Sequence, residues 1–79
     1  MMNERGLKLI EKVISLIDSF QQDYGQFRYC FTVYSYANYH MIVCHILGEG
    51  KRIEFVIEEK DEPLLYDIFK QKSDELMGL

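Results

Sequence analysis

The first part of the chain repeats apolar side chains at the spacing of an α-helix. Projected at about 100° per residue, the apolar residues between positions 3 and 22 fill one half of a helical wheel. They are Leu7, Leu9, Ile10, Val13, Ile14, Leu16, Ile17 and Phe20. Asn3 is the expected N-cap, and Gly25 marks the expected end of the helix. An apolar face this wide predicts packing against a sheet.

Three segments in the middle of the chain, 27–36, 40–47 and 52–58, have the pattern of β-strands. The first is dense in aromatic and β-favouring residues, and the third alternates between apolar and polar positions. Because the links between them are short, we expect the three strands to pair as an antiparallel meander.

A second helix is predicted over residues 62–77. The polar segment 59–63 follows the third strand, with Asp61 or Glu62 near the helix cap and Pro63 in the first turn. The expected buried stripe consists of Leu64, Leu65, Ile68, Phe69 and Leu76. Residues 1–79 are therefore predicted to form one α+β domain, a two-layer α-β-β-β-α fold with both helices on one face of the meander.

The two links between strands decide which side chains share a face of the sheet. We expect three-residue loops at 36–38 and 48–50, each with a residue that tolerates the left-handed conformation, Asn38 or Gly50, in third position. In that register the helix-covered face carries Phe27, Tyr29, Phe31, Val33, Met41, Val43, His45, Leu47, Ile53, Phe55 and Ile57. The open face carries Arg28, Cys30, Thr32, Tyr34, His40, Ile42, Cys44, Ile46, Arg52, Glu54, Val56 and Glu58.

The middle strand is apolar on both of its sides. One side presents Met41, Val43 and Leu47, and the other presents Ile42, Cys44 and Ile46. A one-residue slip at either turn would exchange the faces of a strand relative to its neighbours. The middle strand would still offer apolar side chains to both faces.

Composition indicates a folded chain, with 48% hydrophobic and 28% charged residues. No apolar run approaches the roughly 20 residues of a membrane span, and the first residues lack the pattern of a secretory signal. Cys30 and Cys44 are too few for a disulfide framework, so we expect free thiols in the cytoplasm. Residues with A/T-rich codons dominate, which is typical of a low-GC bacterium, its phage or a plasmid.

Catalytic and metal-binding constellations are weak. Cys44 and His45 are neighbours on a strand and point to opposite faces, so they cannot form a dyad. Cys30 or Cys44 beside His40 is the remaining nucleophile pair. A zinc site built from these three residues and Glu58 lacks the paired short spacings of structural zinc. We expect no catalytic residue, no metal and no cofactor.

Nucleic-acid binding is disfavoured by the net charge of −4. The order of elements is also that of double-stranded-RNA-binding domains, but those domains open their last helix with basic residues. This chain has Glu59, Asp61 and Glu62 there. A nucleic-acid surface would instead use the candidates Arg28, Arg52, Tyr34 and Tyr36, whose rings could stack on bases.

The open face is the candidate binding site. Its expected centre is apolar, consisting of Cys30, Ile42, Cys44, Ile46 and Val56. Its expected rim consists of Arg28, Tyr34, Tyr36, His40, Arg52, Glu54 and Glu58. An apolar centre with a polar and aromatic rim is typical of protein interfaces.

We therefore expect a small non-enzymatic protein-interaction module. It would be a regulator or inhibitor that binds a larger protein, or a homodimer formed through the open face. In its sharper form it is a phage or mobile-element product that blocks a host or defence protein. The alternatives are a nucleic-acid-binding domain with double-stranded-RNA-binding-like topology, and an enzyme or a part of an enzyme complex.

Overall fold

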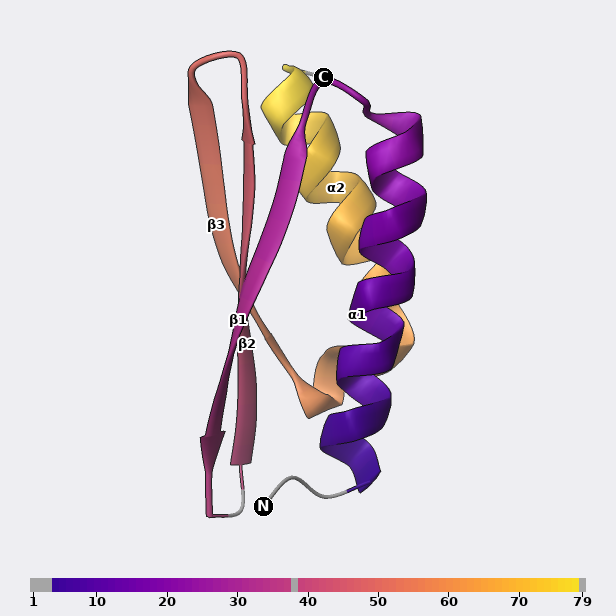
Figure 1. Cartoon of the computed structure of the whole chain (residues 1–79), viewed down its shortest axis with the longest axis vertical. Helices are drawn as coiled ribbons and strands as arrows, with labels where there is room; N and C mark the ends of the chain where they lie inside the picture. The colour runs from indigo at the N-terminus through magenta and orange to yellow at the C-terminus, as the bar shows by residue number, and fades with distance from the viewer. Residues whose placement is uncertain (1–3, 38, 79) are drawn as a thin grey trace.

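The computed structural model describes residues 4–37 and 39–78. Its elements follow the order α1 (Glu4–Asp23), β1 (Arg28–Tyr36), β2 (Tyr39–Gly48), β3 (Lys51–Glu58), a 3₁₀ helix η1 (Glu59–Leu64) and α2 (Leu65–Met77). The strands form one antiparallel sheet in the order β1-β2-β3, and both helices lie on the same side of it (Figure 1). The predicted α+β class and α-β-β-β-α order are confirmed.

Helix α1 packs on the sheet through the middle of its apolar face. Gly6, Leu9, Val13 and Phe20 are buried, at positions that recur on one side of a helix. The helix ends at Asp23, two residues before the glycine expected to stop it. The expected cap at position 3 lies outside the described residues.

The strand register differs from the predicted one at both turns. Tyr36 pairs with Tyr39, and Gly48 pairs with Lys51, so each link has two residues rather than three. Each shorter turn shifts the pairing by one residue and reverses the faces of β2 relative to its neighbour. The two shifts cancel between β1 and β3, so the predicted faces of those two strands are correct.

The prediction is therefore wrong for β2, whose two faces are exchanged. The residues expected on the open face that instead lie buried under the helices are His40, Ile42, Cys44 and Ile46. The residues that occupy the open face of β2 in their place are Met41, Val43, His45 and Leu47. The prediction that this strand is apolar on both sides is confirmed.

The backbone of the turn between β2 and β3 explains how a link of two residues can connect these strands. Glu49 and Gly50 both have positive φ angles, 53° and 75°, as a type I′ turn requires. The left-handed conformation predicted for Gly50 is confirmed, whereas that predicted for Asn38 lies outside the described residues. Just before the turn, a Cβ at Gly48 would clash with the ring of Phe27, so the glycine also allows close packing at this end of the sheet.

Glu49 is a poor fit to its backbone, because a residue with a Cβ resists positive φ and type I′ turns favour asparagine at this position. We expect Glu49→Asn to raise the free energy of unfolding by about 0.5–1 kcal/mol. Gly50→Ala, the matched change at the next residue, should lower it by about 1 kcal/mol. Urea titrations of the three proteins measure both effects, and a lower midpoint for Glu49→Asn would contradict the turn assignment.

The second helical segment begins earlier than predicted and in a tighter form. The 3₁₀ helix η1 contains Pro63, and the backbone N–H of Glu58 donates to Oδ2 of Asp61 at 2.9 Å in a capping box. Of the expected stripe, Leu65, Phe69 and Leu76 are buried and Ile68 is partly buried. The prediction is wrong for Leu64, which is 56% exposed because it lies in η1 rather than on the packed side of α2.

Phe69 is the centre of the core between the two layers. Its ring meets Phe20 of α1 at 5.8 Å, Tyr29 of β1 at 6.4 Å and Phe55 of β3 edge-on at 5.4 Å between centroids. The hydroxyls of Tyr29 and Ser73 share a buried hydrogen bond of 2.7 Å. Burial raises the pKa of Tyr29 further above its ordinary value.

Candidate interaction surfaces

The residues predicted as a possible nucleophilic or metal site are not brought together. Cys30 and Glu58 lie on the open face, whereas Cys44 and His40 lie on the covered face. Nδ1 of His40 is 3.3 Å from Oγ of Ser35, a hydrogen bond within the same face. Burial raises the pKa of the Cys44 thiol to about 12, so Cys44 is a protonated core residue rather than a nucleophile.

The two thiols should differ sharply in reactivity. Cys30 is exposed and Cys44 is buried, so the native protein should react with one equivalent of iodoacetamide or a disulfide reagent at pH 8. The second equivalent should react only in denaturant, where the Cys44 pKa returns toward 9.0. Native Cys30→Ser should give almost no rapid labelling. Rapid labelling of Cys44 in that variant would contradict the orientation of β2.

A row of three polar side chains crosses the open face at the level of Cys30. Cys30, His45 and Glu54 are directly paired on β1, β2 and β3. Nδ1 of His45 is 3.4 Å from Oε1 of Glu54, and Sγ of Cys30 is 3.9 Å from the backbone carbonyl of His45. The hydrogen bond of the thiol is to this backbone carbonyl, which is not a base that could activate it. The sequence would have predicted this row if both links had been assigned as two-residue turns, because that register pairs the three residues.

The open face keeps most of the predicted rim and gains a new centre. The predicted residues that lie on it are Arg28, Cys30, Tyr34, Tyr36, Arg52, Glu54, Val56 and Glu58. Its middle is apolar, because Val43 lies between Thr32 and Val56, and Val56 is 50% exposed. The two tyrosines, Tyr34 and Tyr36, are exposed toward the end of the face nearest the β1–β2 turn.

Charge on the open face is concentrated at the opposite end. Arg28 and Arg52 flank Leu47 there, in one row across the three strands. Nη2 of Arg52 donates to Oε1 of Glu54 at 3.1 Å. Arg28 is exposed and has no ion pair with any residue in 4–37 or 39–78. Among the described residues, nothing pairs with the charge of this guanidinium.

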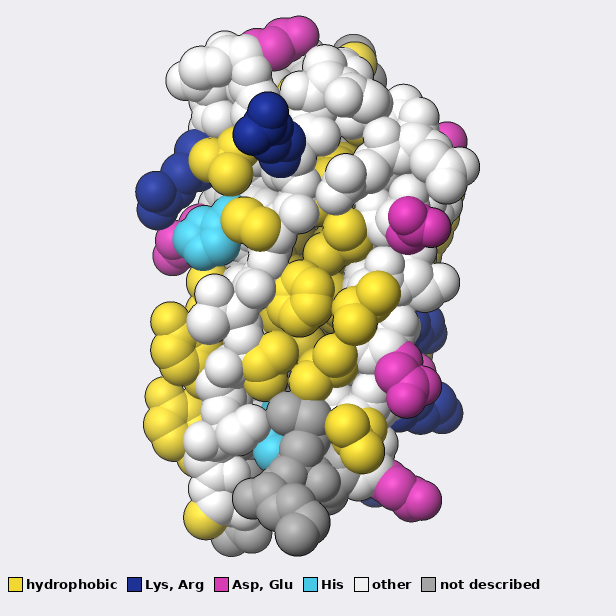
Figure 2. All heavy atoms as spheres, in the orientation of Figure 1, with side chains coloured by type: hydrophobic (Ala, Val, Ile, Leu, Met, Phe, Trp, Pro, Cys, Tyr) yellow, Lys and Arg dark blue, Asp and Glu magenta, His cyan; other side chains and the backbone are white. Residues whose placement is uncertain are grey.

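A second apolar surface, which the sequence did not predict, lies between α1 and the outer edge of β1. We call it the edge surface, and it consists of Leu7, Ile10, Ile14, Ile17, Phe31 and Val33. Leu7 and Ile14 are 51% and 52% exposed, and the other four are partly buried. Figure 2 shows apolar side chains gathered along the middle of the view, where α1 and β1 face the reader.

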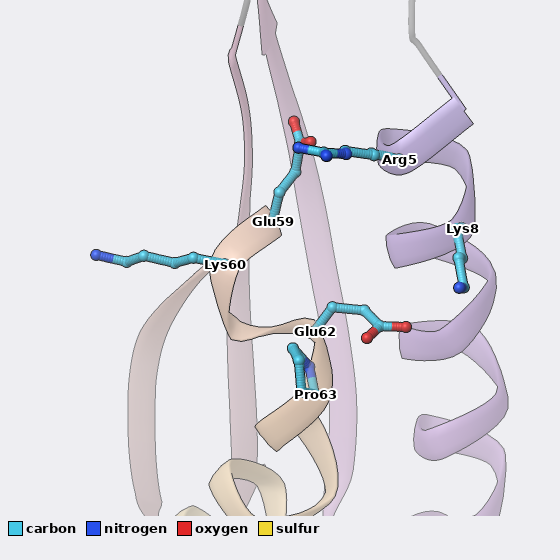
Figure 3. A pocket seen from close by; sticks show the side chains of 6 residues that line it. All are labelled: Arg5, Lys8, Glu59, Lys60, Glu62 and Pro63. Carbon is cyan, nitrogen blue, oxygen red and sulfur yellow. The ribbon is translucent and has the colours of Figure 1, made fainter.

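A hollow of about 420 Å³ lies between the start of α1 and η1. Figure 3 shows the six residues that line it, which are Arg5, Lys8, Glu59, Lys60, Glu62 and Pro63. Lys12, one turn further along α1, donates to the backbone carbonyl of Glu62 at 3.0 Å and lies 3.5 Å from its carboxylate. Cations and carboxylates are therefore mixed here, and the hollow selects neither an anion nor a cation.

The described residues provide neither a metal site nor a membrane-spanning helix. Within 4–37 and 39–78, no group of three or more His, Cys, Asp and Glu side chains is arranged to hold a metal ion. Neither of the two α-helices in this part of the chain is long and apolar enough to cross a membrane. Comparison of the chain with protein-family models, curated proteins and solved structures yields no match.

Proposed function

We propose that this chain is a non-enzymatic interaction module that binds a protein partner through the open face of its sheet. The observation that supports this most is the apolar centre of that face, Met41, Val43 and Val56. A sheet covered by helices on one side normally alternates to polar residues on the other. Apolar side chains grouped on such a face favour contact with another protein.

The surroundings of this centre indicate the chemistry of the partner. Arg28, unpaired within the described residues, calls for a carboxylate at one end of the contact. Tyr34 and Tyr36 at the other end combine an apolar ring with a polar hydroxyl, as residues at protein interfaces often do. The partner surface should therefore be apolar in its middle and acidic beside Arg28.

The size of the face sets the strength of the contact. Three strands about 4.8 Å apart, with a mean length of nine residues at about 3.3 Å per residue, cover about 14 by 30 Å. This is about 400 Å², roughly half of what each partner contributes to a standard interface. The open face alone thus supports a weak, reversible complex, as suits a regulator.

Inhibition could also work by mimicry, with the acidic residues Glu58, Glu59, Asp61 and Glu62 imitating the phosphates of a nucleic acid in the groove of its binding protein. This mode receives less support than binding by the sheet, because Glu58 is 3.3 Å from Lys60 and Glu62 is 3.5 Å from Lys12, which partly neutralises the cluster. A regulator of a host protein, encoded by a phage or another mobile element, would therefore act through its open face.

The proposal can be tested by capturing a partner from a lysate of the source organism on immobilised wild-type protein and on two variants in parallel. We expect immobilised wild-type protein and Leu64→Glu to retain the same partner, because Leu64 lies in η1, away from the sheet face. Val43→Glu should lose it. The purified partner should then bind the wild type, by calorimetry, at least tenfold more tightly than Val43→Glu. Equal binding would refute the proposal.

A nucleic acid is the competing outcome of this test. Arg28 and Tyr34 are six residues apart on β1, which is about 20 Å, so phosphate contacts and base stacking would lie at opposite ends of the face. Glu58, paired across the sheet with Met41, lies near the tyrosine end. Anisotropy of labelled single-stranded RNA at low salt should show no binding at micromolar protein, and clear binding would favour this alternative.

A further inference from the structure

We propose that the edge surface is the docking site of a basic amphipathic helix that belongs to another protein. This helix packs along α1, with its apolar stripe on the edge surface and a row of lysine or arginine residues beside the acids that border it. The site is separate from the open face of the sheet. The inference is therefore independent of the proposed function.

The spacing of the apolar residues on α1 indicates that the occupant is a helix. The exposed flank of α1 carries apolar side chains three, four and three residues apart, at the a and d positions of a coiled-coil seam, namely Leu7, Ile10, Ile14 and Ile17. Lys12, on the opposite flank, donates to Glu62 of η1, so the seam faces away from η1 and α2. Leu7 and Ile14 are about half exposed, and the seam is therefore open to the side chains of a second helix.

A row of acidic residues borders this seam on its solvent side. Glu4, Glu11 and Asp18 are spaced by seven residues, and helical projection places them in a line next to Leu7 and Ile14. All three are exposed, and none of them forms an ion pair with any residue in 4–37 or 39–78. They occupy the e positions of the seam, where charges select the partner helix by pairing with the opposite sign.

The cations of α1 lie on its other flank. Arg5 and Lys8 line the hollow beside η1, and Lys12 contacts Glu62. By helical projection, none of these three cations lies between the acidic row and the seam. Negative charge is thus concentrated beside exposed apolar surface, and electrostatic complementarity calls for a cationic partner.

The two borders of the seam define the face of the partner helix. On the solvent side the partner meets the acidic row, and on the sheet side it meets Phe31 and Val33, among the apolar side chains between α1 and β1 in Figure 2. The partner should therefore be basic along one border of its apolar stripe and apolar along the other. From Glu4 to Asp18 the row is about 21 Å long at about 1.5 Å per residue, which matches a helix of about four turns.

The acidic row also disfavours the other occupants of an apolar surface. A second copy of this chain would bring its own acidic row to the same contact, and the two rows would repel each other. Anionic lipid headgroups and the phosphates of a nucleic acid carry the same sign of charge and are repelled as well. A basic helix is the occupant that the row attracts.

A pair of designed peptides tests this inference with the full chain. The first is a labelled helix of three heptads with leucine at a and d, lysine at e, alanine at g and glutamine elsewhere. The second has glutamate in place of each lysine. We expect fluorescence anisotropy to show micromolar binding of the lysine peptide and at least tenfold weaker binding of the glutamate peptide. Added salt should weaken the binding of the lysine peptide.

Variants of the chain locate the contact. Ile14→Gln should weaken binding of the lysine peptide about thirtyfold, because it removes apolar contact from the middle of the seam. Glu11→Lys should weaken it about fivefold. Glu49→Lys is the matched control, since it changes the net charge equally but lies in the turn between β2 and β3, away from α1 (Figure 1). It should bind like the wild type.

Reversal of the whole row should reverse the preference for the peptides. The triple variant Glu4→Lys, Glu11→Lys, Asp18→Lys should bind the glutamate peptide more tightly than the lysine peptide. Circular dichroism should show that every variant keeps the fold. Val43→Glu, altered on the open face, should still bind the lysine peptide, so failure of the proposed function would be recognised separately.

Three results would overturn the inference. The first is no binding of the lysine peptide at 500 µM protein. The second is equal weakening by Glu49→Lys and Glu11→Lys, because net charge alone would then explain the binding. The third is a different occupant, seen as a wild-type dimer in sedimentation equilibrium or as flotation with phosphatidylglycerol vesicles, that Ile14→Gln abolishes.

Discussion

Replacing Ile42 by glutamate should unfold the protein, whereas the same replacement at its neighbour Val43 should leave it folded. Ile42 is fully buried beneath the helices, between Val33 and Ile57 on the adjacent strands. A carboxylate there loses its hydration without gaining a partner, which costs several kcal/mol in addition to the lost apolar contacts. A chain of 79 residues has a total stability of only about 4–12 kcal/mol.

Val43 tests the other face of the same strand. Its side chain lies on the open face beside Thr32 and Val56, where a carboxylate reaches water. We expect Val43→Glu to cost less than about 1.5 kcal/mol. Far-ultraviolet circular dichroism and urea titration of the two variants measure the difference. The reverse result, a folded Ile42→Glu and an unfolded Val43→Glu, would restore the register with three-residue turns.

Truncation of Phe69 should have the next largest effect. Phe69 is fully buried and is the only ring that joins α1, β1 and β3 among the aromatic contacts between described residues. Phe69→Ala removes these contacts and leaves a cavity, which typically costs about 3–5 kcal/mol. We expect a protein that is largely unfolded at 37 °C.

A graded series distinguishes cavity formation from a general sensitivity to substitution. Phe69→Leu should be destabilised less than Phe69→Ala, because it leaves a smaller cavity. Tyr34→Ala removes a ring that is 45% exposed on the open face and should change stability by less than about 1 kcal/mol. Thermal unfolding of the three variants supplies the comparison. Equal losses for Phe69→Ala and Tyr34→Ala would mean that Phe69 does not connect the layers.

The sequence pattern was sufficient for the elements and their order, because helices and strands impose different periods on apolar residues. It failed at the turns. The hydrophobic pattern cannot distinguish a two-residue link from a three-residue link when the flanking strand is apolar at every position. This is the case from Met41 to Cys44. No residue pattern in β2 distinguishes its covered face from its open face. A positive φ angle is also not expected for a glutamate such as Glu49. The predicted centre of the open face therefore consists of residues from the wrong side of β2.

The edge surface was missed for a different reason. Eight apolar residues on half of a helical wheel predict a single face packed on a sheet. A sheet contacts only a narrower stripe, and Leu9, Val13 and Phe20 suffice for that contact. The remaining width, including Leu7 and Ile14, stays exposed beside the edge of β1. The edge surface could have been predicted from the width of the apolar arc, because the arc is wider than the stripe of a helix that a sheet can cover.

The two-sided apolar character of β2 also bears on how the chain reaches its native state. During folding, a hairpin that forms one residue out of register buries nearly as much apolar surface as the native one, so collapse alone discriminates poorly between them. The preference for the native register over the shifted one comes from the turns. They must form the tight two-residue geometry before the helices cover the sheet. A chain trapped with β2 reversed can correct itself only by breaking both ladders, so turn residues such as Glu49 and Gly50 should control the rate of folding more than their few contacts suggest.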